Sequence, residues 1–429
     1  MLNGLILSLQ VVMWGVFLYF FILSIFGWVK KKEIDIKEFP VKSRFAILVA
    51  AHNEEAVIGE AVRSLKKLNY PKELYDIFVI ADNCDDNTSM VARKNGAIVY
   101  ERFDNVKRGK GFSLEWMFKK LFAMDKEYDA VCVLDADNLV SSNFLMEMNK
   151  HLCMGHKVVQ GYLDSKNPYD SWISGNNSIA FWISNRLVQL PRYYMGLSCI
   201  LGGTGFIVAT DILKEIGWGA TCLVEDLEFT LKLILRGNKV YWAHDAVIYD
   251  EKPLTLKQSW RQRKRWMQGH FDCVGRFFKK LLVKAIKEKN PIAFDSLMYL
   301  AQPVVVVVSG AGVLLSVLFG ILNILYLTFG WKLGGFELIY IQDASLTIQK
   351  AFMGFVSCVF LYISVFFVII EGKMSKRIIK YLLLMPIYNL TWVPIIVKGF
   401  MDRDKREWTH TLHTRAMEIS DIESLEKVG

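Results

Sequence analysis

Long apolar runs and shorter alternating segments divide this 429-residue chain into contrasting regions. Residues 5–28 form a nearly uninterrupted apolar run, and two further long runs lie at about 302–327 and 351–370. Each run is long enough to span a bilayer as a helix. Residues 381–397 are apolar but shorter, contain two prolines and have basic residues on both sides. That combination predicts a re-entrant or interfacial segment rather than a full crossing.

Between the first two runs, residues 44–250 alternate between strand-like and helix-like stretches. Short continuous apolar runs predict buried strands, and apolar residues spaced three and four apart predict helices. The predicted strands are 45–51, 75–81, 97–100 and 130–134, and the predicted helices are 54–68, 89–95 and 111–122. Strands that alternate with helices are typical of an α/β fold with a mostly parallel sheet and right-handed crossovers.

Basic residues beside the apolar runs predict how the chain is oriented. Trp28 and the lysines at 30–32 have the character of an interfacial anchor, and no small-residue cleavage site follows the first run. We therefore expect an uncleaved transmembrane helix rather than a signal peptide. The excess of lysine and arginine places residues 30–296 in the cytoplasm, with the N-terminus outside and the C-terminus inside. The expected location is the cell membrane, as a multi-pass protein with a cytosolic folded domain.

Composition supports this mixed character. The chain is 53% hydrophobic and 22% charged, which is too apolar for an ordinary soluble protein and too charged to be membrane throughout. Its net charge of +9 comes mainly from basic residues next to the apolar runs, which favours contact with anionic lipid over nucleic acid. The seven cysteines form no C-x-x-C pair, which favours a reduced compartment without a disulfide framework.

The carboxyl ends of the predicted strands carry acidic and amide side chains. These are Asn53 and Glu54 after the first strand, Asp82 after the second, and Asp135 and Asp137 after the fourth. Ligands of open α/β sheets bind at this edge, and two carboxylates one residue apart repel each other unless a cation lies between them. Mg²⁺ and Mn²⁺ bind carboxylate oxygens and leave positions for phosphate. The set predicts a metal and diphosphate site, although each residue singly is equally typical of a helix cap or turn.

Three later segments add candidates. Lys110 lies among two glycines and two further bases, where it can neutralise a diphosphate or simply belong to a solvated loop. The three glycines in residues 202–205 allow close approach of a ligand or of another segment. Glu225 and Asp226 precede a predicted helix at 227–235, where Asp226 is either a cap or a base that accepts a hydroxyl proton.

Residues 256–287 form an amphipathic, strongly basic segment with tryptophan and phenylalanine on its apolar side. Anchoring in the membrane interface accounts for most of its bases. Within it, Gln262, Arg265 and Trp266 can present an amide, a guanidinium for a diphosphate and an indole for the face of a sugar ring. The expected organisation is a transmembrane helix at 1–29, an α/β domain at 30–255, interfacial helices at 256–296, a transmembrane region at 297–400 and a cytosolic tail at 401–429.

Taken in order, these motifs resemble those of the membrane-embedded, processive family-two glycosyltransferases, namely the cellulose, hyaluronan, chitin and poly-N-acetylglucosamine synthases. The resemblance rests on Asn53-Glu54-Glu55, Asp82, Asp135-x-Asp137, Gly202–Gly205, Glu225-Asp226 and Gln262-x-x-Arg265-Trp266, within about residues 40–270. Any one of these motifs is weak evidence alone, whereas the complete set in this order is specific. His52 departs from the pattern, because a tyrosine is usual at that position.

The resemblance implies a Rossmann-like GT-A catalytic domain in the cytosol that uses a UDP-sugar with Mg²⁺ or Mn²⁺. It implies that the nucleotide contacts Asn53, Glu54, Asp82, Lys110, Asp135 and Asp137, the last two also holding the metal. It implies that Asp226 is the general base with Glu225 beside it, and that the diphosphate and the acceptor contact Gly203, Thr204, Gln262, Arg263, Arg265 and Trp266. The tail residues Trp408, Thr411 and Arg415 resemble an element that covers the nucleotide in some of these synthases.

These features together predict an inverting polymerase that builds a β-linked glycan from a UDP-hexose and passes the growing polysaccharide across the membrane. UDP-glucose is favoured, because residues 202–205 and 224–226 are closer to glucan synthases than to hyaluronan synthases; UDP-N-acetylglucosamine is the alternative donor. A single transfer to a lipid is the alternative acceptor reaction. A transporter or scaffold would need intramembrane charge, which the spans nearly lack. Few spans are available to line a channel, which favours a homo-oligomer or a helper membrane subunit.

Overall fold

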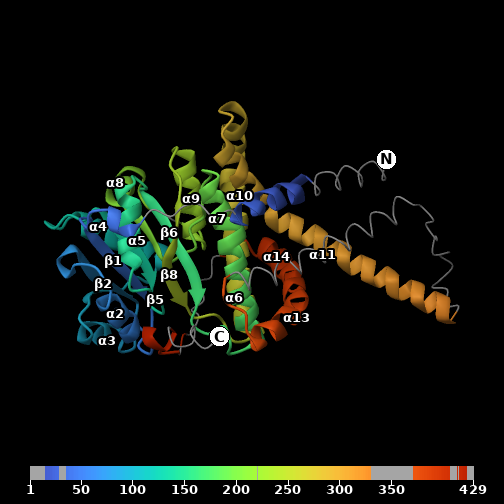
Figure 1. Cartoon of the computed structure of the whole chain (residues 1–429), viewed down its shortest axis with the longest axis horizontal. Coiled ribbons are helices and arrows are strands. Elements are labelled where there is room, and N and C mark those ends of the chain that lie inside the picture. The colour runs from blue at the N-terminus through green and yellow to red at the C-terminus, as the bar shows by residue number, and fades with distance from the viewer. Residues whose placement is uncertain are drawn as a thin grey trace.

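The computed structural model describes residues 15–28, 35–219, 221–329, 371–405, 413 and 415–422, with the backbone alone for 312–329. Its centre is an eight-stranded sheet in the order β3-β2-β1-β4-β7-β6-β8-β5 (Figure 1). The strands are β1 Phe45–Ala51, β2 Tyr75–Asp82, β3 Ile98–Arg102, β4 Ala130–Asp135, β5 Leu139–Val140, β6 Val158–Ser165, β7 Phe206–Ala209 and β8 Tyr241–Asp250.

The first half of the sheet is parallel, as predicted, but the sheet as a whole is mixed. Strands β1, β2, β3 and β4 pair in parallel, and so do β6 and β8. Strand β7 is antiparallel to both of its neighbours, β4 and β6, and β5 is antiparallel to β8. The expectation of a mostly parallel sheet is therefore wrong for this half, because a short buried apolar run has the same pattern in either direction.

Helices cover both faces of the sheet. The helices are α2 Ile58–Lys66, α3 Thr88–Lys94, α4 Lys110–Phe122, α5 Phe144–Cys153, α6 Trp172–Ser184, α7 Leu190–Tyr194, α8 Thr210–Ile216, α9 Glu225–Leu235, α10 Leu256–Lys287, α11 Pro291–Phe329, α13 Lys376–Leu390 and α14 Trp392–Met401. Single turns lie at Phe26–Trp28, Ile36–Glu38 and Lys72–Leu74, and a π-helical turn at Asn185–Gln189 joins α6 to α7.

Side chains of β1 show how the two cores form. Phe45, Ile47 and Val49 pack into one cluster with α2 and α5, whereas Ala46 and Leu48 pack into the other with α4 and α6. Alternate residues of a strand point to opposite faces, so a strand covered by helices on both sides is apolar throughout. This arrangement buries the strands and leaves their carboxyl ends at one edge for polar chemistry.

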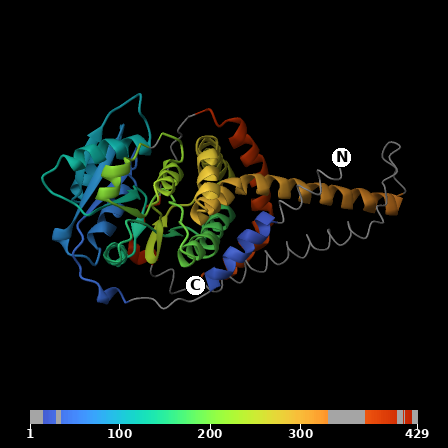
Figure 2. The same ribbon diagram turned by 90° about the horizontal axis from the view of Figure 1, so that it is seen from above.

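A second helical layer begins with α10, a 32-residue helix that a reciprocal bond between Thr255 and Gln258 caps. Apolar residues of α9, α10 and α11 form one buried cluster that includes Leu231, Phe277 and Leu297. Beyond this cluster α11 projects away from the sheet (Figure 2). Helices α9 and α10 thus connect the sheet to the apolar helices.

Two helices in the described part of the chain are long and apolar enough to cross a membrane, Pro291–Ala311 and Lys376–Met401, and a shorter apolar helix covers Gly15–Trp28. Residues 381–397 belong to the second of these, which changes from α13 to α14 at Thr391. The predicted run at 351–370 lies outside the described residues. Length and composition alone do not decide topology, so the three-span topology and the re-entrant segment stay predictions.

A buried ion pair ties the apolar helices to the sheet domain. The Arg192 guanidinium of α7 pairs with Asp295 of α11 at 2.8 Å, and both side chains are almost completely buried. The hydroxyl of Tyr19, from the N-terminal helix, donates to the same carboxylate at 2.7 Å. Three segments that are far apart in sequence therefore meet at Asp295, which supplies an acceptor to each of the other two.

Candidate active site

The ends of β1 and β2 are held together by side-chain to backbone bonds. Asn53 adopts a left-handed φ of 54°, a conformation that asparagine tolerates better than most residues. Its Oδ1 accepts from the backbone N–H of Asp85 at 3.0 Å, and a ring nitrogen of His52 lies 2.7 Å from the Asp82 carbonyl oxygen. The backbone N–H of Glu54 donates to Thr88 Oγ1 at 2.8 Å. The structure thus brings the first two predicted strand ends side by side.

Asp82 is buried at the end of β2 and pairs with Arg102 at 2.5 Å. Burial raises the pKa of Asp82 above its ordinary value, and the positive charge of Arg102 opposes that rise. Arg102 also donates to Asp104 and to the Lys107 carbonyl oxygen, so it fixes the loop that leads to Lys110. Sequence reasoning missed Arg102, although its place at the end of β3 was a usable signal.

Lys110 begins α4 and joins three segments. Its ammonium group pairs with Asp135 Oδ1 and donates to the Gly203 carbonyl oxygen at 2.7 Å. Burial alone would lower the pKa of Lys110, but Asp135 and Glu225 raise it above its usual value, so the ammonium is charged. Thr204 Oγ1 accepts from the backbone N–H of Asp135 at 3.0 Å. The basic loop, the Asp-x-Asp strand end and the glycine loop therefore meet at one place.

Asp137 lies deeper than Asp135 and is only 5% exposed. Its Oδ2 accepts from the backbone N–H of Glu251 at 2.8 Å. Burial by itself would raise the pKa of Asp137, but the positive charges of His413 and Lys166 lower it below the usual value. Asp137 is therefore ionised at neutral pH, and two buried cations balance its charge.

His413 comes from the C-terminal tail and reaches the same carboxylates. A ring nitrogen lies 2.9 Å from Glu54 Oε1. Burial would lower the pKa of His413, but Asp137 and Glu54 together raise it to about 10. The imidazole is consequently protonated at neutral pH. No local pattern in the sequence pointed to this residue.

Glu225 and Asp226 form the first turn of α9, against the glycine loop. A Cβ atom built on Gly203, whose φ is 82°, would lie 3.3 Å from Asp226 Oδ2, so a side chain there would crowd the carboxylate. Burial and then the negative charge of Glu225 raise the pKa of Asp226 to about 7. Asp226 thus has the proton affinity that suits a general base near neutral pH.

Helix α10 packs against the residue that precedes the first turn of α9. Gly269 lies so close to Val224 that an added Cβ would come within 2.4 Å of the valine side chain. Arg265 is near enough to Glu225 to lower the pKa of that carboxyl group, although burial raises it overall. Trp266 packs edge-on against Phe181 of α6, with ring centroids 6.3 Å apart. Buried Gln262 Oε1 has no hydrogen-bond partner within the described residues.

Arg263, in contrast, points away from the carboxylates. Its side chain is completely buried between the rings of Tyr388 and Trp392, and it donates to Thr391 Oγ1 at 3.0 Å. These contacts join α10 to α13 and α14. The structure therefore does not bring Arg263 to the site with Arg265 and Trp266, and its surroundings are those of a structural residue.

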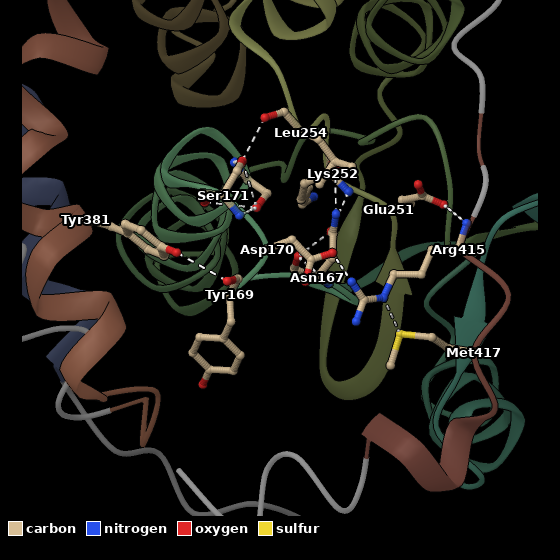
Figure 3. Close-up of polar contacts among 12 residues, drawn as sticks. Asn167, Tyr169, Asp170, Ser171, Glu251, Lys252, Leu254, Tyr381, Arg415 and Met417 are labelled. Carbon is tan, nitrogen blue, oxygen red and sulfur yellow. Dashed lines mark hydrogen bonds and ion pairs between the residues drawn. The ribbon is translucent and has the colours of Figure 1, made fainter.

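The tail residue Arg415 lies beside the strand ends, as Figure 3 shows. Its guanidinium pairs with Asp170, and its backbone N–H donates to Glu251 at 3.1 Å. Met417 and Ile422 then pack with Leu139 of β5 and Tyr249 of β8. Trp408 and Thr411, the two other tail residues predicted to cover the nucleotide, lie outside the described residues.

Further charged residues of the site were missed by sequence reasoning. Buried Lys166 follows β6 and partly buried Asp250 ends β8, and both lie close enough to Asp137 to interact with its charge. Burial raises the pKa of Asp250 to about 6, with Lys252 opposing the rise. Each lies at or just after the end of a strand that the sequence analysis did not assign, so the rule that strand ends carry ligands would have found both residues had β6 and β8 been predicted.

The two carboxylates of Asp135 and Asp137 fit a hard divalent cation as a partial ligand set. Asp135 keeps 38% of its side chain exposed, so an incoming ion and phosphate can reach it. No group of three or more histidine, cysteine, aspartate or glutamate side chains in the described part of the chain is arranged to hold a metal ion. Phosphate and water oxygens would therefore have to complete the coordination, as Mg²⁺ sites commonly require.

Sequence comparison identifies the chain. Residues 43–269, more than half of the chain, match the family model described as "Glycosyltransferase like family 2". The chain belongs to glycosyltransferase family 2. That matched range contains the strand-end residues, the glycine loop, Asp226 and Trp266, and it ends within α10. Its sheet domain therefore has a GT-A-like α/β glycosyltransferase fold.

Curated relatives of this family-2 glycosyltransferase have different printed activities. It is 26% identical over 276 residues to "Probable glycosyltransferase YdaM" of Bacillus subtilis, covering 62% of this chain and 63% of that protein. It is 27% identical over 237 residues to a beta-monoglucosyldiacylglycerol synthase of Synechocystis, covering 53% and 47%. It is 26% identical over 277 residues to a poly-beta-1,6-N-acetyl-D-glucosamine synthase of Staphylococcus aureus, covering 59% and 61%. The chain thus spans about half to under two thirds of these relatives.

A solved structure with a similar fold is the mannosyltransferase PcManGT from Pyrobaculum calidifontis in complex with GDP-Man and Mn²⁺. The TM-score is 0.58, with 16% identity, and the match covers 95% of this glycosyltransferase and all of the other chain. At this identity the likeness concerns the fold alone. It extends beyond the sheet domain, since nearly the whole chain is covered.

Proposed function

We propose that this family-2 enzyme transfers a hexose from a UDP-sugar with inversion, and that it repeats the transfer to build a β-linked polysaccharide at the membrane. The observation that carries the proposal is the position of Asp226. Its half-buried carboxylate, with a pKa of about 7, lies against the glycine loop whose carbonyl oxygen binds Lys110, and Lys110 pairs with Asp135. The proposed base and the proposed diphosphate site therefore lie against the same glycine loop.

Asp226 would remove the proton from the acceptor hydroxyl as that oxygen attacks the anomeric carbon. The bond to the departing UDP would break at the same time, so an α-linked donor would give a β-linked product. Lys110 and Arg265 would stabilise the negative charge that develops on the diphosphate. Buried Asp82, held by Arg102, would accept hydrogen bonds from the nucleoside part of the donor.

Asp135 and Asp137 would hold Mg²⁺ or Mn²⁺, the bound ion supplying charge stabilisation to the leaving diphosphate. In the described structure, Lys110 and His413 neutralise these carboxylates. We expect the tail with His413 and Arg415 to shift when a charged donor and its cation enter, because two cations and a metal ion would otherwise compete for the same carboxylates. Arg415 then remains a candidate for covering the bound nucleotide.

The acceptor would lie beside Trp266, whose indole offers an apolar face to a sugar ring. Gln262, whose buried carbonyl oxygen has no hydrogen-bond partner among the described residues, would accept a hydrogen bond from an acceptor hydroxyl. These two residues favour a saccharide acceptor, and hence a polymer. UDP-glucose is the favoured donor and UDP-N-acetylglucosamine the alternative.

A lipid acceptor is the second candidate. Two observations favour it: relatives named as beta-monoglucosyldiacylglycerol synthases match more than half of this chain, and apolar helices pack directly against α10. In that case a single sugar would be transferred to a lipid hydroxyl at the membrane surface, with the same base and the same diphosphate site.

The deciding experiment incubates the purified full-length protein with Mg²⁺ or Mn²⁺ and a panel of radiolabelled UDP-sugars, with and without diacylglycerol. A high-mass product that a linkage-specific β-glycosidase digests supports the polymerase. A labelled glycolipid in the organic phase, with no high-mass product, supports the lipid reaction instead. Turnover that persists in excess chelator would rule out the metal site.

Asp226→Asn and Asp137→Asn test the assigned roles. Each should lower transfer by on the order of 10³-fold, because one removes the base and the other removes a metal ligand. Asp211→Asn is the matched control, since Asp211 is an exposed carboxylate in the first turn of α8. Wild-type rates in either site variant, with normal thermal unfolding, would refute its role.

Trp266→Ala separates acceptor binding from donor activation. Loss of the indole should slow chain elongation about tenfold or more, because stacking on an aromatic ring stabilises a bound sugar, while slow hydrolysis of the UDP-sugar by water continues. Radiolabel in polymer and free UDP are measured in the same reaction. Equal loss of both would mean that Trp266 supports the fold of the site and does not bind the acceptor.

A further inference from the structure

A basic pocket lies apart from the transfer site, between the loop after α8, the last turns of α9 and the middle of α10. Its volume is about 580 Å³, which is within the range of small-molecule sites. The charged residues that line it are four cations, Lys232, Arg236, Arg276 and Lys280, and one carboxylate, Glu115 of α4, so positive charge exceeds negative charge among the lining residues. Figure 1 shows α9 beside α10.

The pocket has an inner and an outer pair of cations. Lys232 and Arg276 are partly buried, and both pair with Glu228, which is completely buried. Arg236 and Lys280 lie at the exposed mouth, and no ion pair joins either of them to a carboxylate within the described residues. The outer pair therefore remains available to an anion. Arginine and lysine close together on a concave surface are typical of phosphate sites.

The pocket opens away from the apolar surface of α10. Phe278, Leu282 and Ile286 are exposed and follow one another at four-residue spacing, so they share one face of the helix. Arg276 and Lys280 lie on roughly the opposite face, next to α9. If the apolar face lies on the bilayer, as expected for this amphipathic helix, a lipid headgroup cannot easily enter the pocket, whereas a soluble anion can.

We propose that this pocket binds a soluble, multiply charged phosphate ester and that its occupancy regulates glycosyl transfer. The route of coupling is short. Glu228 accepts hydrogen bonds from the backbone N–H groups of Thr221 and Cys222 at 2.7 and 2.9 Å, and these two residues precede the turn that carries Glu225 and Asp226. A bound anion would attract Arg276 and Lys232 and so weaken their ion pairs with Glu228. The hydrogen bonds by which Glu228 holds Thr221 and Cys222, just before that turn, would then change as well.

Binding is tested on the full-length protein in detergent, by titration calorimetry with inorganic pyrophosphate in a chelating buffer. Arg236→Ala with Lys280→Ala should weaken binding by about tenfold for each cation removed. Lys279→Ala with Lys287→Ala is the control, because it removes the same charge from the same helix without touching the pocket. Equal weakening in both double variants would show a diffuse charge effect and overturn the proposal.

The transfer site also contains cations, so Arg265→Ala is measured alongside. Pyrophosphate binding that is lost in Arg265→Ala and retained in the Arg236/Lys280 variant would place the anion in the transfer site and overturn the proposal. A lipid source is tested by flotation with phosphatidylglycerol and with phosphatidylcholine vesicles. Selective loss of phosphatidylglycerol binding in the Arg236/Lys280 variant, with unchanged pyrophosphate affinity, would assign the pocket to a headgroup instead.

Regulation is tested in the transfer assay with the free metal concentration held constant. The Arg236/Lys280 variant should keep the basal rate, because neither residue touches the transfer site, and it should lose the response to pyrophosphate seen in the wild-type enzyme. A wild-type rate that does not change at saturating pyrophosphate would exclude coupling. This readout is independent of which acceptor the enzyme uses.

Discussion

Asp226 owes its unusual proton affinity to the residues that surround it. Burial removes water from the carboxylate, and Glu225 adds a like charge one residue away. Lys110 and the helix N-terminus oppose both effects, so the pKa settles at about 7 instead of rising further. A small change in any neighbouring charge should therefore move the working pH of the enzyme.

The pH profile follows from this balance. In its proposed role as the general base, Asp226 acts only when it is ionised, so the transfer rate should rise as pH increases through about 7 and then level off. Glu225→Gln removes the repulsion that raises the pKa, so the midpoint of the rise should move to lower pH. Lys110 faces the same two carboxylates, and because its pKa is raised above the usual value it stays protonated throughout this range. Arg265 adds a positive charge near Glu225. The measurement is the initial rate at saturating donor from pH 5.5 to 9.

A midpoint near pH 4 in the wild-type enzyme would show that Asp226 is not the titrating base. An upward shift in Glu225→Gln would be inconsistent with like-charge repulsion as a cause. The Asp211→Asn variant, which alters an exposed carboxylate elsewhere, should leave the profile unchanged.

At the level of secondary structure, α10 positions the site through close contact. Gly269 allows the helix backbone to approach Val224, just before the turn that carries Asp226. The same helix carries Arg265 and Trp266 on one side and Arg263 on the other. A side chain that pushed α10 away from Val224 would consequently move Arg265 and Trp266 relative to Asp226.

Two glycine substitutions on α10 separate packing from helix propensity. Gly269→Ala should lower stability by about 1–3 kcal/mol through overpacking against Val224, and it should also lower the transfer rate. Gly275→Ala is the control, because no atom lies within 4 Å of its added Cβ, and alanine should stabilise the helix by about 0.5–1 kcal/mol. Thermal unfolding and initial rates measure both effects. Unchanged stability and an unchanged transfer rate in Gly269→Ala would mean that α10 can move away from Val224 without loss of free energy or activity.

At the level of the whole molecule, Asp295 connects the apolar helices to the sheet domain. Its carboxylate accepts from Arg192 of α7 and from Tyr19 of the N-terminal helix. A buried charge without its partner is strongly unfavourable. The relative placement of the three segments therefore depends on one completely buried side chain.

Asp295→Ala should lower stability by about 3–5 kcal/mol, because it leaves Arg192 charged and buried. Arg192→Met combined with Asp295→Ala should recover part of the loss, since no buried charge then remains. Asp211→Ala, which breaks an exposed ion pair with Lys157, should have little effect. Thermal unfolding of the purified protein in detergent compares the three. A stable single variant would mean that water reaches Arg192.

The sequence predicted features that are local and missed those that depend on distant partners. The apolar run before Asp135 and Asp137 marked a buried strand with acids at its end, because both signals lie within seven residues. The sequence of a basic helix does not tell which of Arg263 and Arg265 faces the site. The difference comes from Tyr388 and Trp392, which lie more than 120 positions later and pack against Arg263. The direction of β7 was likewise not encoded in its own residues, since it depends on how the chain returns from α7.

The tail has a practical consequence for anyone who wishes to isolate the catalytic half. His413 is 359 positions from Glu54, yet the two side chains are in contact, and Met417 and Ile422 cover apolar side chains of β5 and β8. A fragment truncated after α10 would uncover that patch and remove the imidazolium that neutralises the strand-end acids. Such a fragment would carry more negative charge at its strand ends than the intact protein. Its affinity for nucleotides would therefore differ from that of the full-length chain.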